Sequence, residues 1–250
     1  MREKNALKKI TDGHILELFA FDYGQNGTVT GTDEAGRGPA AGGVFAAAVC
    51  FHEINHDLTE KLRILNDSKQ LSQKNRETLY DIIKENSLNA VYRIEVEEIE
   101  KINILKASLK AMRLACLDVV RQLTNLRMTG YSLNFTETPN NEKMQPVQNN
   151  IITLVDGNKN IPEYPYAQCT VIKGDSRSAS IAAASILAKV ARDRYMEKLD
   201  AEYPQYGWAK NAGYLTKEHL TAIDKYGLSP YHRPSFLKKH FAKQKQLQLF

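Results

Sequence analysis

"TVTGTDEAGRGPAAGG" occupies residues 28–43 and places two acids, Asp33 and Glu34, directly before a turn rich in glycine. The β-branched residues at its start favour a strand, and the glycine and proline residues that follow favour a turn. Two adjacent carboxylates repel each other, and bare backbone costs chain entropy. We therefore expect a strand that ends at a functional site, with residues 36–38 forming part of that site.

Strand and helix patterns alternate along the rest of the chain. Strands are predicted at 42–51, 89–99, 150–157 and 166–175. Helices are predicted at 15–23, at 72–85 with Ser72 as N-cap, and at 103–123, 178–200 and 216–227. Because helices gather late in the chain, this order predicts a mixed α/β sheet with a C-terminal helical part.

Composition describes one sizeable domain of 250 residues with a formal net charge of +5, which favours acidic partners such as nucleic acid. No apolar leader or run of about 18 apolar residues occurs, so secretion and membrane spanning are disfavoured. Cys50, Cys116 and Cys169 are far apart and form no CxxC pair, which is typical of reduced core thiols. We expect a cytoplasmic monomer that contacts no membrane.

Four acids share one kind of sequence context, because each lies where a predicted strand ends. They are Asp33, Glu34, Asp156 and Asp175. Chemistry in open α/β sheets gathers at strand ends, so these carboxylates can converge. For Asp156 and Asp175, taken singly, a turn or helix-cap role is an equally ordinary alternative.

Converging carboxylates require protons or cations to offset their repulsion. Oxygen ligands without histidine or cysteine suit Mg²⁺ or Mn²⁺ rather than zinc. Two such ions, about 3.5–4 Å apart, support phosphodiester hydrolysis. Together with the basic charge, the acids predict a nuclease.

The sequence around these acids resembles ribonuclease HII, the type 2 ribonuclease H family. The matching blocks are "GTDEAGRGPAAG" (31–42), "NDSKQLS" (66–72), "INILKASLKAMR" (102–113), "LVDGN" (154–158), "KGDSRSASIAAASILAKVARDRYM" (173–196) and "GYLTKEHLTAIDKYGLSPYHRPSF" (213–236). The resemblance implies a ribonuclease H-like fold, with a mixed central sheet flanked by helices and a small C-terminal helical subdomain. We accordingly divide the chain into an extension (1–26), a core (27–200) with an inserted loop (129–149), a helical subdomain (201–242) and a tail (243–250).

The same resemblance implies metal-dependent cleavage of RNA in RNA–DNA hybrids and incision 5′ of single ribonucleotides in duplex DNA, leaving 3′-hydroxyl and 5′-phosphate ends. It implies roles in ribonucleotide excision and in primer removal during replication. The family's four acids match Asp33, Glu34, Asp156 and Asp175, which would hold two Mg²⁺ or Mn²⁺ ions with substrate bound. Two rival functions are a hybrid nuclease without junction specificity and a catalytically silent hybrid-binding protein.

The resemblance also implies which residues bind substrate. Gly36, Arg37 and Gly38 match a turn that recognises the 2′-hydroxyl and its phosphates, and Tyr214 matches a tyrosine that stacks at the RNA–DNA junction. Ala212 and Leu215, beside Tyr214, depart from the family pattern.

Five further residues are predicted phosphate contacts, although a solvated helix face is the alternative for the row on 185–192. They are Lys69, Lys173, Ser185, Lys189 and Arg192. His219, His232 and His240 are predicted to be structural or exposed, and Trp208, Tyr203 and Tyr206 to pack the helical subdomain.

The last five residues, "QLQLF" (246–250), resemble the peptide with which bacterial repair enzymes bind the sliding clamp. Gln246, Leu247, Leu249 and Phe250 would then be the anchors of a tail that docks in a hydrophobic groove. The alternative is an end that folds back onto the domain.

Overall fold

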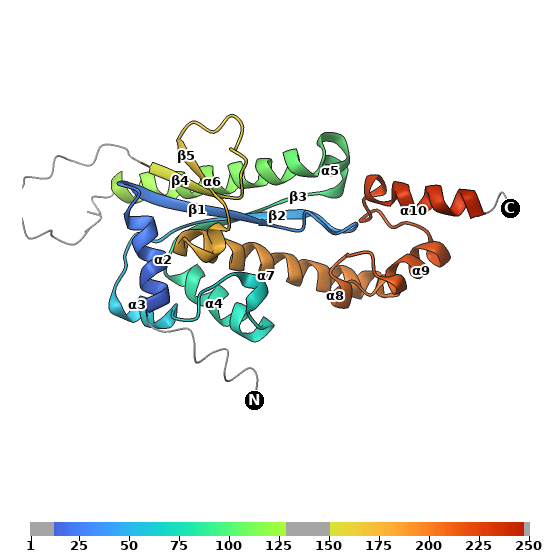
Figure 1. Cartoon of the computed structure of the whole chain (residues 1–250), viewed down its shortest axis with the longest axis horizontal. Helices are drawn as coiled ribbons and strands as arrows, with labels where there is room; N and C mark the ends of the chain where they lie inside the picture. The colour runs from blue at the N-terminus through green and yellow to red at the C-terminus, as the bar shows by residue number, and fades with distance from the viewer. Residues whose placement is uncertain (1–12, 129–150, 248–250) are drawn as a thin grey trace, which may run out of the picture.

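A computed structural model describes residues 13–128 and 151–247, in which a five-stranded mixed sheet carries helices on both faces (Figure 1). The strand order is β3-β2-β1-β4-β5. β1 lies at the centre, antiparallel to β2 and parallel to β4, so the carboxyl ends of β1 and β4 meet at one edge. The predicted fold class is confirmed. The strands are β1 (Thr28–Ala35), β2 (Val44–Cys50), β3 (Leu88–Ile94), β4 (Ile151–Asp156) and β5 (Ala167–Val171).

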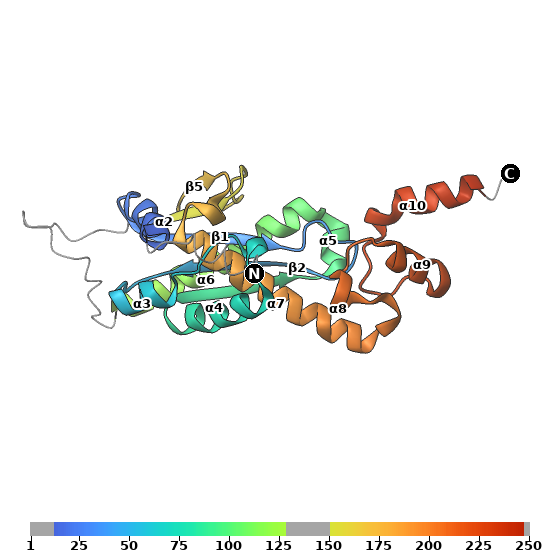
Figure 2. The ribbon, with the colours of Figure 1, turned by 60° about the horizontal axis from the view of Figure 1, so that its bottom comes forward.

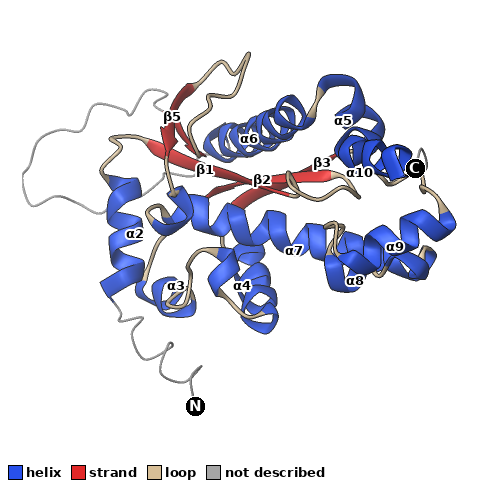
Figure 3. Cartoon of the chain, turned by 45° about the vertical axis from the view of Figure 1, so that its right-hand side comes forward, coloured by secondary structure: helices blue, strands red, loops and turns tan. Residues whose placement is uncertain are grey.

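The two faces of the sheet have separate apolar cores. α6 covers one face and α7 the other, together with α2, α3 and α4 (Figure 3). β2 supplies both cores by simple alternation: Ala47 and Val49 face α7, whereas Ala46 and Ala48 face α6. The helices are α2 (Gly13–Tyr23), α3 (His56–Lys61), α4 (Gln73–Glu85), α5 (Val96–Ile102), α6 (Ile104–Met128) and α7 (Ala179–Glu202).

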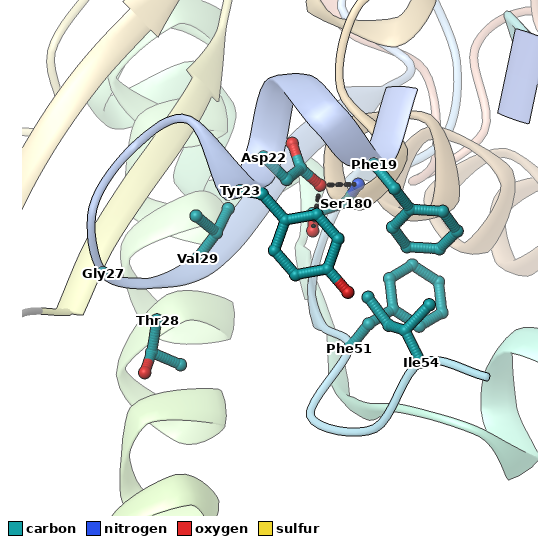
Figure 4. Close-up of a pocket in the computed structure, with 9 residues that line it drawn as sticks. All are labelled: Phe19, Asp22, Tyr23, Gly27, Thr28, Val29, Phe51, Ile54 and Ser180. Carbon is teal, nitrogen blue, oxygen red and sulfur yellow. Dashed lines mark hydrogen bonds between the residues drawn. The ribbon is translucent and has the colours of Figure 1, made fainter. Parts of the chain in front are cut away.

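Helix α7 crosses β1 at very short range. A Cβ at Gly31 would lie 2.3 Å from the backbone nitrogen of Ile181, so only glycine permits this crossing. The N-terminus of α7 is fixed by Asp22 of α2, whose carboxylate accepts hydrogen bonds from the Ser180 nitrogen (2.9 Å; Figure 4) and from Ser178 Oγ (2.5 Å). Burial raises the pKa of Asp22 to about 6. The expected packing of residues 15–23 as a short helix is thereby confirmed.

Three more helices lie beyond the end of the sheet, around the C-terminal half of α7 (Figure 2). Tyr206 stacks on Trp208 with ring centroids 5.0 Å apart, and Tyr203 lies 5.9 Å from Trp208, so the predicted packing role of these rings is confirmed. These helices are α8 (Trp208–Asn211), α9 (Lys217–Tyr226) and α10 (Pro234–Leu247).

Several boundaries differ from those predicted. The strand expected over 89–99 ends at Ile94, because the buried Val96 and Ile99 are three residues apart and form the inner side of α5. Helix α10 continues to Leu247, although a tail was expected from 243. Cys169 is exposed on edge strand β5 and is no core thiol, unlike Cys50 and Cys116.

The expected insertion at 129–149 lies outside the described residues. Two 3-10 turns carry residues of interest below, η1 (Ser68–Gln70) and η2 (Gly174–Ser176), and a third, η3 (Pro204–Tyr206), precedes α8. Over 13–128 and 151–247, each helix is too short or too polar to cross a bilayer.

Candidate active site

Asp33 and Glu34 lie near the C-terminal end of β1. Both line one cavity of ≈ 320 Å³. Neighbouring strand residues normally point to opposite faces. Here the Glu34 nitrogen donates to Asp33 Oδ1 (2.7 Å), and the chain turns directly afterwards at Gly36, whose φ is +99°. The strand end thus brings two adjacent acids to the same cavity.

Asp156 and Asp175 reach the same cavity from neighbouring segments. Asp156 is the last residue of β4, beside β1, and Asp175 lies in η2. The nitrogen of Gly174 donates to Asp156 Oδ1 (2.7 Å), and a Cβ at Gly174 would lie 3.1 Å from that oxygen. The glycine therefore orients Asp156 toward the cavity. We call Asp33, Glu34, Asp156 and Asp175 the acid group.

The acid group is electrostatically strained. Burial, and then the charges of Glu34 and Asp156, hold the pKa of Asp33 well above its ordinary value. Burial also raises the pKa of Glu34, against the opposing effect of Arg37, whose Nη1 lies 3.1 Å from Glu34 Oε1. Burial raises the pKa of Asp175, and Asp67 adds to this effect. The ionised state of the group therefore needs additional positive charge.

The donors are carboxylate oxygens, which fit Mg²⁺ or Mn²⁺. Across 13–128 and 151–247, however, no three His, Cys, Asp or Glu side chains already surround one point as metal ligands. The acid group therefore fits an ion that keeps water or substrate oxygens among its ligands, as Mg²⁺ usually does.

The same cavity is also lined by Gly36, Arg37 and Gly38, which we call the glycine turn, and by Tyr214. The Tyr214 side chain is exposed, and a Cβ at Gly38 would lie 3.2 Å from its Cε1 atom. A Cβ at Gly36 would lie 2.2 Å from Arg192 Nε. Both glycines therefore let neighbouring side chains contact bare backbone.

Two buried arginines hold the backbone that follows the glycine turn. Arg192 Nη2 donates to the carbonyls of Ala41 (3.2 Å) and Ala212 (3.0 Å). Arg233, fully buried, donates to the carbonyls of Pro39 (2.8 Å) and Gly42 (2.6 Å and 2.9 Å). Burial, and then Arg192, lowers the pKa of Arg233 to about 9. Sequence analysis missed Arg233, since nothing in "YHRPSF" marks an arginine as buried.

The predicted phosphate contacts separate into three kinds. Lys69, Ser185, Lys189 and Arg192 all line the cavity, whereas Lys173 is exposed outside its lining. Ser185 Oγ lies 2.9 Å from Ser68 Oγ and also hydrogen-bonds Asp33, and Lys189 Nζ pairs with Asp193 (2.6 Å). Ser185, Lys189 and the Nη2 group of Arg192 thus all have partners within the chain, which leaves the exposed Lys69 as the most available cation at the cavity.

Histidine is absent from the described residues that line the cavity. His219 and His232 are buried in the helical subdomain, and His240 Nε2 lies 2.7 Å from Asp224 Oδ1, so the predicted structural or surface location is confirmed.

Two solved structures share this ribonuclease H-like fold. The ribonuclease HII of Archaeoglobus fulgidus, solved in complex with PCNA, matches with a TM-score of 0.57 and 24% identity, covering 82% of this chain and 93% of that one. Bst-RNase HIII, solved in complex with Mn²⁺, matches with a TM-score of 0.60 and 16% identity, covering 88% of this chain and 71% of that one. These likenesses concern the fold.

Sequence comparison is more specific. The family model for ribonuclease HII matches residues 30–244. Ribonuclease HII of Fusobacterium nucleatum is 47% identical over 225 residues, which cover 90% of this chain and 91% of that protein. The chain therefore belongs to the ribonuclease HII family, endoribonucleases that cleave the RNA of RNA–DNA hybrids and ribonucleotides embedded in DNA.

Proposed function

We propose that the chain incises duplex DNA on the 5′ side of a single embedded ribonucleotide, leaving 3′-hydroxyl and 5′-phosphate ends. The observation that carries this proposal is the shared cavity, which is lined by the acid group, the glycine turn and Tyr214. One substrate can thus meet carboxylates and bare backbone together.

The acid group would hold Mg²⁺ or Mn²⁺, two ions when substrate is bound. Such ions supply a Lewis acid and an activated water for hydrolysis. Asp33 and Asp156 would face the ions as a fixed pair, because Ser185 and Gly174 respectively donate to their carboxylates. Glu34 would complete the group from the end of β1.

The glycine turn and Tyr214 would select the junction. Bare backbone at the half-buried Gly36 and the exposed Gly38 can approach a 2′-hydroxyl, the group that distinguishes RNA from DNA. The Arg37 side chain, 49% exposed, can bind phosphate in bidentate fashion. The exposed Tyr214 ring can stack on the adjacent sugar.

Phosphates outside the junction would contact Lys69 and Lys189 at the cavity, and Lys173 farther along the duplex. Ser185 and Arg192, which we expected to bind phosphate, would act mainly by fixing Asp33 and the backbone after the glycine turn.

The C-terminal residues would bind a sliding clamp, and the relative from Archaeoglobus fulgidus was solved with PCNA. Gln246 and Leu247 end helix α10, whereas Leu249 and Phe250 lie outside the described residues. We further propose a cytoplasmic monomer that serves ribonucleotide excision and primer removal.

The test uses labelled duplex DNA with one ribonucleotide, incubated with Mg²⁺, Mn²⁺ or chelator. We expect metal-dependent incision 5′ of the ribonucleotide and none with chelator or with Asp33→Asn. An all-DNA duplex and a long RNA–DNA hybrid serve as controls. Cleavage of the long hybrid alone would overturn the proposed junction specificity.

A further inference from the structure

We propose that His219, supported by His232, is a positioning residue that fixes Tyr214 against the glycine turn and thereby sets selectivity for the ribonucleotide junction. The inference rests on the proposed function, because it assigns a support to the tyrosine that would recognise the junction. His219 itself touches neither the cavity nor the acid group.

The chain fixes the protons of both imidazoles. The Tyr214 carbonyl can only accept, so His219 Nδ1, 2.9 Å away, carries a proton and donates. Trp208 Nε1 can only donate, so His219 Nε2, at 3.1 Å, accepts. The Ser229 nitrogen donates to His232 Nδ1 (2.9 Å), which leaves the proton of His232 on Nε2. His232 Nε2 lies 3.1 Å from His219 Nε2 and donates to it.

This arrangement fixes the direction of His219. Its acceptor nitrogen takes donors from Trp208 and His232, so its one N–H must point at the Tyr214 carbonyl. His219 is fully buried and sits edge-on to the ring of Tyr206, at a centroid distance of 6.1 Å. Burial lowers its pKa, which keeps the ring neutral.

The bond to the Tyr214 carbonyl acts on a segment that also contacts the glycine turn. The Ala40 nitrogen donates to the carbonyl of Gly213 (2.9 Å), and the Tyr214 ring lies against Gly38. The Tyr214 side chain is exposed, and the backbone that carries it is held by bonds from its nitrogen to the Asn211 carbonyl (2.9 Å) and from the Thr216 nitrogen to its own carbonyl (2.9 Å), besides the bond from His219. Loss of the His219 bond would leave the Thr216 nitrogen as donor to this carbonyl, and would loosen the segment that holds the ring against the glycine turn.

Two near-isosteric variants separate positioning from general packing. The amide of His219→Asn reaches the Nδ1 position and can still donate to the Tyr214 carbonyl. The amide of His219→Gln reaches the Nε2 position and can still accept from Trp208, but the bond to Tyr214 is lost. Both variants lose the imidazole ring of His219 and its packing. Each variant therefore controls for the loss of stability that this change causes in the other.

The measurement is the ratio of single-turnover rates on a single-ribonucleotide duplex and on a long RNA–DNA hybrid, with thermal unfolding alongside. We expect His219→Gln to lower this ratio roughly tenfold, the size of one lost hydrogen bond, and His219→Asn to retain it. In a Tyr214→Ala background, His219→Gln should not change the ratio further. Equal ratios in both single variants would overturn the proposal.

The tautomers can be tested in the unaltered protein, independently of how the variants fold. Long-range ¹H–¹⁵N NMR correlations should show His219 protonated on Nδ1 and His232 on Nε2. A proton on His219 Nε2 would overturn the proposal. Absence of single-ribonucleotide incision by the wild type would instead refute the proposed function, and would leave the tautomer result standing.

Discussion

The acid group and the glycine turn line one cavity but differ in how the chain compensates their polar groups. In the acid group, burial and neighbouring carboxylates raise the pKa values of Asp33, Glu34 and Asp175, so negative charge is only partly offset by the chain. Around the glycine turn, by contrast, buried Arg192 and Arg233 and the neutral His219 donate to backbone carbonyls. The acid group needs an added cation, whereas the backbone carbonyls around the glycine turn already have donors within the chain. This contrast supports the proposed separation between chemistry at the acid group and junction selection at the glycine turn.

The largest effect should come from Asp33→Asn. We expect cleavage of both substrates to fall on the order of 10³-fold, because a ligand is lost where charge develops in the transition state. In chelator, however, the variant should unfold at a higher temperature, since a neutral amide removes the cost of ionising a buried acid. Asp57→Asn, at an exposed acid of α3 that pairs with Lys61, is the control: it should leave cleavage unchanged and should not raise the unfolding temperature. A lower unfolding temperature for Asp33→Asn would show that the acid group is not strained.

Arg233→Met removes the donor that supports the backbone after the glycine turn. The carbonyls of Pro39 and Gly42 would be left buried without their donor, and we expect the free energy of unfolding to fall by about 3–5 kcal/mol. Arg37→Met, at an exposed arginine, should change it by less than about 0.5 kcal/mol while weakening substrate binding. Urea denaturation measures both. Similar losses in the two variants would mean that Arg233 does not support the turn.

The pH dependence of stability provides a third comparison. Burial, and then His219, lowers the pKa of His232 from 6.5 to about 4. As pH falls, the unfolded state therefore binds a proton on His232 before the folded state does. The stability that depends on a neutral His232 is fully present above pH 6.5 and is lost as pH falls toward 4. Its full size is on the order of 3 kcal/mol.

His232→Gln keeps a donor at the Nε2 position but does not titrate in this range. Between pH 6.5 and 4, the wild type should therefore lose more stability than the variant, measured by urea denaturation at each pH. Asp22, whose pKa burial raises to about 6, acts with the opposite sign in both proteins and cancels in the difference. Parallel pH profiles would contradict a neutral, buried His232.

The smallest effect is expected for Gly38→Ala. The added methyl carbon would lie 3.2 Å from Tyr214 Cε1, so the exposed ring must shift by a few tenths of an ångström. We expect the ratio of junction to hybrid cleavage to fall about fivefold with little change in stability. An unchanged ratio would show that contact between Tyr214 and Gly38 is not needed for selection.

Strand ends could be predicted from the sequence because β-branched runs followed by glycine mark them, and the four acids lie there. The direction in which each side chain points could not be predicted in this way. Ser185, Lys189 and Arg192 were placed correctly on the cavity. Arg192 is nevertheless buried, because it donates to the carbonyls of Ala41 and Ala212, which come from two distant loops. Spacing along one helix contains no information about such partners.

Long-range polar contacts were the main omission. Asp22 fixes the start of α7 across 156 residues of sequence, and Arg233 reaches Gly42 across 191. Both are charged residues at buried positions, and their local sequence resembles that of ordinary surface residues. Similarly, alternation in "NAVYRIEVEEI" favoured a strand, although burial of Val96 and Ile99 stabilises a helix there.

The most direct test of the division of labour measures two variants on two substrates. Single-turnover rates of Asp33→Asn and Tyr214→Ala are compared with the wild type on a single-ribonucleotide duplex and on a long RNA–DNA hybrid, both with Mg²⁺. Our account predicts that Asp33→Asn slows both substrates by the same factor, whereas Tyr214→Ala slows the single-ribonucleotide duplex much more than the hybrid. Equal slowing of both substrates by Tyr214→Ala would contradict it.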